Sequence, residues 1–283
     1  MFMSEEQSET STDEEFVSVQ DYTGEGFTLR NANPKIEKLA KDHEQKIIET
    51  VEDYLLTKYK TEVTVHNLEP AVDGITAFVE SKKEPRFHTY VVVPVQDSTI
   101  QDEAVFSQSG QVENGIVTGI YAMVYKDEFD ELNRTLESLI STEPIVGLNQ
   151  KALDHISDTN YSTIYYGTAN FDEQLKEISN TYINNPEYGV EEWTSIVKES
   201  GFDPSQFYIN IEFYMEDTRT EPQDSLLKKI TNELETHQNK LPPGAYNIIL
   251  NDNDINKITG IGSKGNSLEK AYPDPLIIPR NKE

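Results

Sequence analysis

A change of hydrophobic period early in the chain most constrains the fold. Apolar residues recur at helical spacing over residues 34–58, and Pro34 is typical of a first helical position. Residues 62–95 then carry three short runs that are typical of strands. In two of them apolar residues alternate with others, and the third is mostly apolar. Asp73 and Gly74 separate the first two runs and predict a hairpin. This order favours an α+β fold, with antiparallel sheets and helices packed on one face.

The second half of the chain predicts a strand–helix–strand unit. A strand-like run at 207–214 precedes a helical pattern at 224–237, and a second strand-like run follows at 245–250. The loop between this helix and the second strand is short, which favours a single sheet that contains both strands. The other expected elements are helices at 116–140, 171–183 and 190–199, a loop at 96–111, irregular structure at 141–170 and an extended tail from Tyr272. Residues 121–125 fit either helix or strand.

The elements group into a domain plan. We expect two closely packed lobes, at 17–145 and 146–283, preceded by an acidic tether at 1–16. The tether contains no basic residue and few apolar ones, so it cannot bury enough surface to offset its chain entropy. It also lacks the basic start and apolar core of a signal peptide.

The charge balance excludes several classes of partner. The chain has 24 basic and 51 acidic residues, which give a formal net charge of −27. Nucleic acids and anionic lipid surfaces are recognised through clustered Lys and Arg, so neither is an expected partner. An acidic surface is compatible with a basic partner, with cation binding or with simple solubility. The absence of cysteine excludes disulfides, a thiolate nucleophile and a thiolate metal site.

Gly260, Gly262 and Gly265 match the dinucleotide-binding pattern G-x-G-x-x-G. In that role the glycines let the backbone approach a pyrophosphate at the start of a helix. Pro273 and Pro275 interrupt the segment that should supply this helix and the next strand. We therefore interpret the motif as a glycine-rich turn after a strand.

Residues 251–256 alternate oxygen-bearing side chains in the manner of a calcium loop. Lys257, however, stands where such a loop needs glycine, and Ser263 stands where it needs a bidentate glutamate. An Asx-rich turn at the end of a strand is the favoured interpretation. A weak cation site at Asn251 to Asp254 stays open as a hypothesis.

Histidine, serine and carboxylate patterns nominate no catalytic, cofactor-binding or metal-ligating residue. None of the five histidines has a metal-binding spacing, although His66 and His88 fall on predicted strands and could approach across a sheet. Ser195 and Ser225 each precede a lysine by three positions, but the S-D-N and K-T-G elements that would give this spacing a meaning do not accompany them. With 51 carboxylates in the chain, an acidic pair at any spacing is uninformative.

Several sequence blocks together carry a family resemblance. They are VSVQDYTGEGF at 17–27, KTEVTVHN at 60–67, TGIYAM at 118–123, LPPGAY at 241–246, and the segments 251–254 and 260–266. In these blocks the chain resembles a family of lipoproteins of unknown function from Gram-positive bacteria, chiefly staphylococci and bacilli. The resemblance implies a signal peptide that ends in a lipidated cysteine, then a polar tether and a globular domain outside the membrane. The chain as given has neither the signal nor the cysteine, and the resemblance assigns no activity, cofactor or catalytic residue.

These observations favour a non-enzymatic surface lipoprotein whose globular part binds an unknown envelope component or protein. Membrane contact would come only through the lipid anchor. One alternative is an envelope hydrolase that uses carboxylates, and another is a cytosolic interaction protein. A deep cleft with two carboxylates of opposed pKa shifts would favour the hydrolase, whereas a flat surface lined with tyrosines would favour binding.

Overall fold

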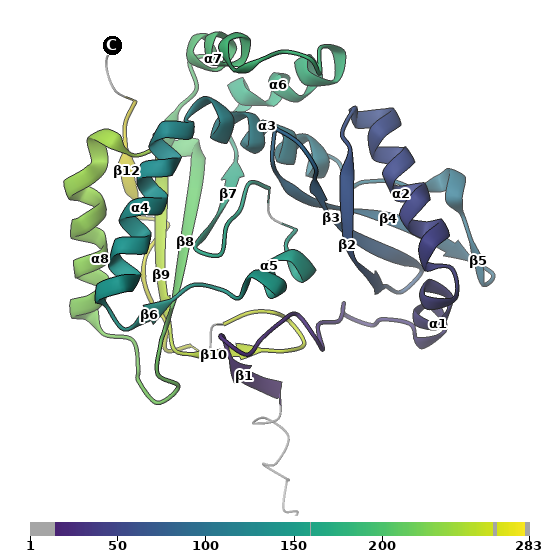
Figure 1. Ribbon diagram of the computed structural model, residues 1–283, viewed down its shortest axis with the longest axis horizontal. Helices are drawn as coiled ribbons and strands as arrows, with labels where there is room; N and C mark the ends of the chain where they lie inside the picture. Colours follow the sequence, from purple (N-terminus) through teal and green to yellow (C-terminus); the bar gives the residue numbers. More distant parts are fainter. Residues whose placement is uncertain (1–14, 159, 263–264, 281–283) are drawn as a thin grey trace, which may run out of the picture.

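The computed structural model describes residues 15–158, 160–262 and 265–280. Figure 1 shows two sheets side by side along the long axis of the molecule, with helices at both ends. The α+β class expected from the sequence is confirmed. Residues 1–14 of the predicted tether at 1–16 lie outside the described residues.

The first sheet is an antiparallel meander in the order β2-β3-β4-β5. Its strands are β2 (Val63–Pro70), β3 (Gly74–Ser81), β4 (His88–Gln96) and β5 (Thr99–Ile100). The antiparallel pairing of β2 with β3 confirms the predicted hairpin. The expected loop at 96–111 is wrong in part, because β5 folds back onto β4 and a 3₁₀ helix, η2 (Asp102–Ala104), follows it.

Two helices, α1 (Pro34–Asp42) and α2 (Glu44–Tyr59), lie against the first sheet. Asn33 caps α1, because its side chain accepts a hydrogen bond from the backbone N–H of Lys35. The single helix predicted at 34–58 divides at His43, where φ of −125° and ψ of 20° leave the helical region. The face of α2 turned toward the sheet buries Ile47, Val51, Leu55 and Tyr59, each four residues from the last.

The second sheet is mixed, with β8 and β9 at its centre. β8 (Phe207–Met215) and β9 (Gly244–Asn251) run parallel and are joined through α8 (Asp224–His237), which confirms the predicted strand–helix–strand unit. Antiparallel partners are β6 (Ile145–Val146) and β7 (Tyr166–Asn170) on β8, and β11 (Leu268–Lys270) and β12 (Leu276–Ile278) on β9. The expected extended tail from Tyr272 therefore contains a sheet strand, β12.

The remaining helices all follow the first sheet in sequence. They are α3 (Gln111–Val124), α4 (Lys126–Thr142), α5 (Gln150–Ile156), α6 (Glu173–Asn184), α7 (Val190–Glu199) and the 3₁₀ helices η3 (Pro204–Gln206) and η4 (Gln238–Lys240). Residues 121–124 are helical, which settles the ambiguity at 121–125. The expected irregular structure at 141–170 is wrong, because β6, α5 and β7 lie there. Hydrophobic periodicity does not reveal these elements, because none of them exceeds seven residues.

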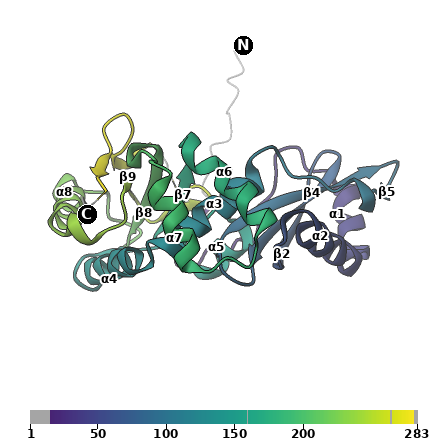
Figure 2. The ribbon, with the colours of Figure 1, turned by 90° about the horizontal axis from the view of Figure 1, so that it is seen from above.

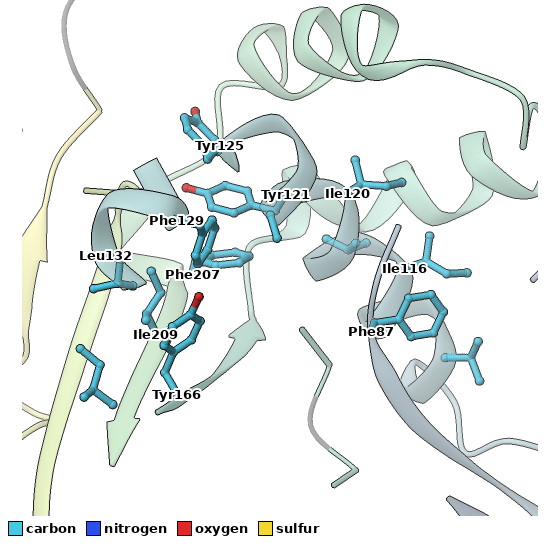
Figure 3. Close-up of a cluster of buried hydrophobic side chains, with 14 of the residues drawn as sticks. Phe87, Ile116, Ile120, Tyr121, Tyr125, Phe129, Leu132, Tyr166, Phe207 and Ile209 are labelled. Carbon is cyan, nitrogen blue, oxygen red and sulfur yellow. The ribbon is translucent and has the colours of Figure 1, made fainter. Parts of the chain in front are cut away.

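Helix α3 joins the two sheets through one continuous hydrophobic core. Figure 3 shows Ile116 beside Phe87, which precedes β4, and Tyr121 beside Phe207 on β8. Seen from above in Figure 2, α3, α6 and α7 lie over the middle of the molecule, between the two sheets. The first sheet and the second sheet are therefore held together by shared packing.

The N-terminal segment of the described chain runs beside a segment near the other end. β1 (Phe16–Ser18) pairs antiparallel with β10 (Asp254–Asn256), in a separate two-stranded sheet. β1 begins at Phe16, the last residue of the predicted tether. This pairing links the predicted lobes at 17–145 and 146–283, and the boundary between them stays a prediction. None of the described helices combines the length and apolar character that crossing a bilayer requires.

Candidate functional site

A cavity of about 500 Å³ opens between the two sheets, and we call it the inter-sheet cavity. Phe78 of β3 lines it from the first sheet, and Asn210, Glu212 and Tyr214 of β8 line it from the second. Further lining residues come from Phe27, from α5 and the residues after it, and from the loop after β10. Figure 1 shows α5 in this central position between the two sheets.

Strand alternation explains why β8 presents polar groups to the cavity. Successive side chains of a strand point to opposite faces of the sheet. The odd-numbered residues Phe207, Ile209, Ile211, Phe213 and Met215 are buried in the hydrophobic core. Asn210, Glu212 and Tyr214 take the other face, which lines the cavity. One strand thus serves the core with one face and the cavity with the other.

Glu212 is the half-buried acid of this polar face. The Nδ2 of Asn251 donates to its Oε1 at 2.6 Å, and Ser267 in turn donates to Oδ1 of Asn251. Burial raises the pKa of Glu212, and hydrogen bonds from Tyr214 and Asn251 offset this only in part. The carboxyl group is therefore held in a fixed position in an environment that disfavours its charge.

The rest of the lining is largely apolar and aromatic. Phe27 packs edge-on against Phe78, with ring centroids 5.8 Å apart and planes at 83°. Asp158 adds a second carboxylate, whereas the rings of Tyr165 and Tyr166 pack against Phe213 and Phe129 on the core side of the sheet. No lysine, arginine or histidine is among the lining residues in the part of the chain that the structure describes. The described lining thus combines apolar side chains with acidic and neutral polar groups.

Ser162 connects the inter-sheet cavity to His88, a buried residue of β4. Ser162 Oγ lies 2.9 Å from His88 Nδ1 and 3.2 Å from the Oγ of Ser157, and both serines line the cavity. Burial lowers the pKa of His88, so a neutral imidazole faces Ser162. A nucleophilic serine needs a third group that orients the histidine, but His88 Nε2 has no hydrogen-bond partner among the described residues.

The two strand histidines noted in the sequence lie on either side of Glu80. A β-bulge at His66 interrupts the register of β2 with β3 and leaves that residue unpaired in the ladder. His66 Nε2 is 3.2 Å from Glu80 Oε2, Arg86 contacts the other carboxylate oxygen, and His88 stands opposite Glu80 in the register of β3 with β4. Over the described residues, no group of three or more His, Asp or Glu side chains is arranged to hold a metal ion.

The glycine motif lies at the rim of the inter-sheet cavity. Gly260 and its neighbours Thr259 and Ile261 line the cavity in a loop that follows β10, so this part of the motif is a turn after a strand, as expected. Gly260 has a φ of 69°, and a Cβ there would lie 2.5 Å from Cδ1 of Ile156 on α5. The motif residues Ser263 and Lys264 lie outside the described residues.

The Asx side chains at 251–254 are engaged within the fold. The carboxylate oxygens of Asp252 accept from the backbone N–H of Asp254 at 3.1 Å and from Asn266 Nδ2 at 2.9 Å. Asn253, fully buried, donates to the backbone carbonyl of Met215 at 2.6 Å. These bonds agree with the interpretation of the run as an Asx-rich turn.

Comparison with known proteins identifies the family. Residues 9–278 match the model of a family described as "Protein of unknown function (DUF1672)". The chain belongs to this family. The crystal structure of a DUF1672 family protein from Staphylococcus aureus subsp. aureus Mu50 has a similar fold, with a TM-score of 0.77 at 17% identity. The match covers 95% of this chain and 99% of that chain, and a comparison with curated proteins found no match.

The polar residues of the cavity were not singled out from the sequence. Asn210 and Glu212 alternate with isoleucines inside a run predicted as a strand, and that alternation is a usable signal. A strand whose second face carries an amide and an acid presents those groups either to solvent or to a cavity, and only the tertiary structure distinguishes the two.

Proposed function

We propose that this DUF1672 protein binds a small organic ligand in the inter-sheet cavity. The observation that carries the proposal is the cavity itself, in which Asn210, Glu212 and Tyr214 converge on a largely apolar space between two sheets. Its volume of about 500 Å³ lies within the range of ligand pockets, which runs from roughly 300 to 1,000 Å³. Apolar walls supply affinity in such pockets, and a few fixed polar groups supply orientation.

A hydrolase that uses carboxylates is the second candidate. It draws on the same cavity, because Asp158 and Glu212 both line it. In such an enzyme the carboxyl group with the raised pKa, that of Glu212, would act as the acid. The two functions separate in one assay: a ligand recovered unchanged after incubation favours binding, and a cleaved ligand favours hydrolysis.

We further propose that the protein acts at the cell envelope as the globular part of a lipoprotein and is not an enzyme. The support is the sequence resemblance described above and the acidic composition of residues 1–16. Fractionation of the native host, with and without an inhibitor of lipoprotein processing, tests the location. Recovery of the native protein in the cytosolic fraction would contradict it.

A thermal-shift screen against sugars, peptides, amines, nucleotides and peptidoglycan fragments tests the proposed binding. A ligand at 100 times its dissociation constant adds about 2.7 kcal/mol to the stability of the folded state, which a melting curve registers. The variant Ile164→Trp narrows the cavity, whereas Ile183→Trp changes a half-buried isoleucine on α6, away from it. A shift that Ile164→Trp abolishes and Ile183→Trp preserves supports the proposal, and a shift that both preserve contradicts it.

A further inference from the structure

We propose that the ligand of the inter-sheet cavity is an organic cation, whose ammonium group binds Glu212 and whose apolar body lies along the aromatic wall. This inference rests on the proposed function and adds the chemical class of the ligand.

Glu212 has hydrogen-bond donors but no cationic partner among the described residues. Its carboxyl group accepts from Asn251 and interacts with Tyr214, and both of these groups are neutral. An ionised carboxylate has about four acceptor sites, so these two donors leave capacity for a further donor. A buried charge is strongly disfavoured unless it is paired. A bound ammonium would supply both the missing charge and further donors.

Glu80 is a half-buried carboxylate that, unlike Glu212, is paired with cationic side chains among the described residues of the same protein. Arg86 and His66 both contact Glu80, and they bring its pKa to about 2 although burial alone would raise it. At Glu212 the neutral donors do not outweigh burial, and the pKa stays raised. The difference between the two acids is the missing cation, which we assign to the ligand.

The lining also excludes an anionic ligand. Asp158 and Glu212 are both acidic, and the described lining residues include no lysine, arginine or histidine. Among the described lining residues an anion would therefore meet two carboxylates and no cationic side chain. The formal net charge of −27 acts in the same direction, because the field of the whole protein attracts cations and repels anions.

The walls suit the apolar body of such a ligand. Phe27 and Phe78 form an edge-to-face pair, and Tyr214 also lines the cavity. Aromatic faces attract ammonium groups through their quadrupoles, most strongly where the cation is desolvated. An arylalkyl amine therefore matches both the acidic group and the aromatic walls.

Three probes that share one apolar body test the assignment: 4-phenylbutylamine, 4-phenylbutan-1-ol and 4-phenylbutanoate. Titration calorimetry near neutral pH gives their affinities for the wild type. We expect the amine to bind at least about tenfold more tightly than the alcohol, which corresponds to about 1.4 kcal/mol, and the carboxylate to bind most weakly. Glu212→Gln should reduce the affinity for the amine to that for the alcohol. The affinity for the alcohol itself should stay unchanged.

Two further variants localise the effect. Asp158→Asn changes the more exposed acid of the cavity, so its effect on the amine should be smaller than that of Glu212→Gln. Glu191→Gln changes an exposed acid on α7, away from the cavity, and should leave all three affinities unchanged. A loss of amine affinity in Asp158→Asn that exceeds the loss in Glu212→Gln overturns the assignment to Glu212.

The pH dependence of the wild type gives a second measure that needs no variant to fold. The amine should bind less tightly as the pH falls through the raised pKa of Glu212, because protonation removes the charge that attracts it. Over this range Asp158 is the other acid that faces the cavity, and the tyrosines there stay neutral. The affinity of the alcohol should stay constant.

The outcomes separate this inference from the proposed function. Equal binding of amine and alcohol, or tighter binding of the carboxylate, overturns the cation assignment and leaves the cavity as a binding site. Absence of binding by all three probes, together with a screen that finds no ligand sensitive to Ile164→Trp, overturns both.

Discussion

The rings of Tyr121 and Phe207 stack with their centroids 3.8 Å apart and their planes 22° from parallel. Tyr121 belongs to α3 and Phe207 begins β8, so the stack connects the bridging helix to the second sheet, as Figure 3 shows. The hydroxyl of Tyr121 also donates to the carbonyl oxygen of Pro243 at 2.6 Å, just before β9. One buried side chain thus holds α3 against both central strands of the second sheet.

Tyr121→Phe keeps the stack and removes the hydroxyl. We expect a loss of about 1–3 kcal/mol in the free energy of unfolding, because the buried carbonyl of Pro243 loses its partner. Tyr121→Ala should cost more, about 3–5 kcal/mol, because it also leaves a cavity. Denaturant unfolding followed by circular dichroism measures both. Tyr188→Phe, at a tyrosine that is 36% exposed, is the control and should change stability little.

Gly119→Ala should destabilise the protein although alanine is the better helix former by about 1 kcal/mol. A Cβ at Gly119 of α3 would lie 2.7 Å from the carbonyl oxygen of Arg86, and backbone cannot move aside cheaply. We expect a net loss of about 1–3 kcal/mol in the free energy of unfolding, and a larger loss for Gly119→Val. A gain in stability for Gly119→Ala would contradict this close approach of α3 to the start of β4.

The sequence predicted the elements whose pattern is local. The β2–β3 hairpin is marked by Asp73 and Gly74, and the strand–helix–strand unit by two strand-like runs with a helical pattern between them, so both could be predicted. β7 was missed because Tyr166–Asn170 contains a glycine and an asparagine, residues that are depleted in strands, and its place depends on pairing with β8. The break at His43 was missed because no proline or glycine marks it.

Lowering the pH should reduce the free energy of unfolding through the protonation of Glu80. Burial by itself would raise the pKa of this carboxyl group, but hydrogen bonds from His66 and Arg86 outweigh burial and bring it to about 2 from an ordinary value of 4.5. A lowered folded-state pKa gives stability that is present above pH 4.5 and is lost as the pH falls from 4.5 toward 2. The expected loss is on the order of 2–3 kcal/mol.

Stability measured against pH for the wild type and Glu80→Gln tests this assignment. The variant curve should be flatter below pH 4.5, because the group that takes up the proton on unfolding is gone. Glu62→Gln changes an exposed carboxylate paired with Lys83 and serves as the matched control, with a curve like that of the wild type. Parallel curves for wild type and Glu80→Gln in this range would rule out the predicted role.

Calcium should leave the melting temperature unchanged in both the wild type and the Asp252→Ala/Asp254→Ala double variant. Both carboxylate oxygens of Asp252 already accept hydrogen bonds within the fold, so a cation would have to displace them. Thermal shift against calcium concentration measures this directly. A saturable stabilisation of the wild type that the double variant lacks would instead establish the weak cation site.

Asn253→Ala should cost about 1–3 kcal/mol of stability, because its side-chain amide donates to the buried carbonyl of Met215 and to Oε1 of Gln20. Asn232→Ala, at an exposed position of α8, is the control and should be close to neutral. Denaturant unfolding of the two variants gives the comparison. Equal stability of Asn253→Ala and the wild type would show that these bonds contribute nothing net.

The inter-sheet cavity could not be predicted from the sequence for a physical reason. Its lining comes from Phe27, Phe78, Ser162, Glu212 and Gly260, which are far apart along the chain. No local pattern records which distant side chains share a space. His66 and His88 could be placed on strands from the sequence, but the bulge that sets His66 beside Glu80 depends on the pairing of β2 with β3.

The pairing of β1 with β10 has a mechanical consequence. The backbone N–H of Lys257 donates to the carbonyl of Glu15, and that of Thr28 donates to the carbonyl of Ile258, so the first described residues are fastened to the segment that leads into the cavity rim. Gly260 and Ile261 follow within a few residues and line the cavity. The N-terminal strand therefore braces the loop that borders the inter-sheet cavity, although the two segments lie at opposite ends of the sequence.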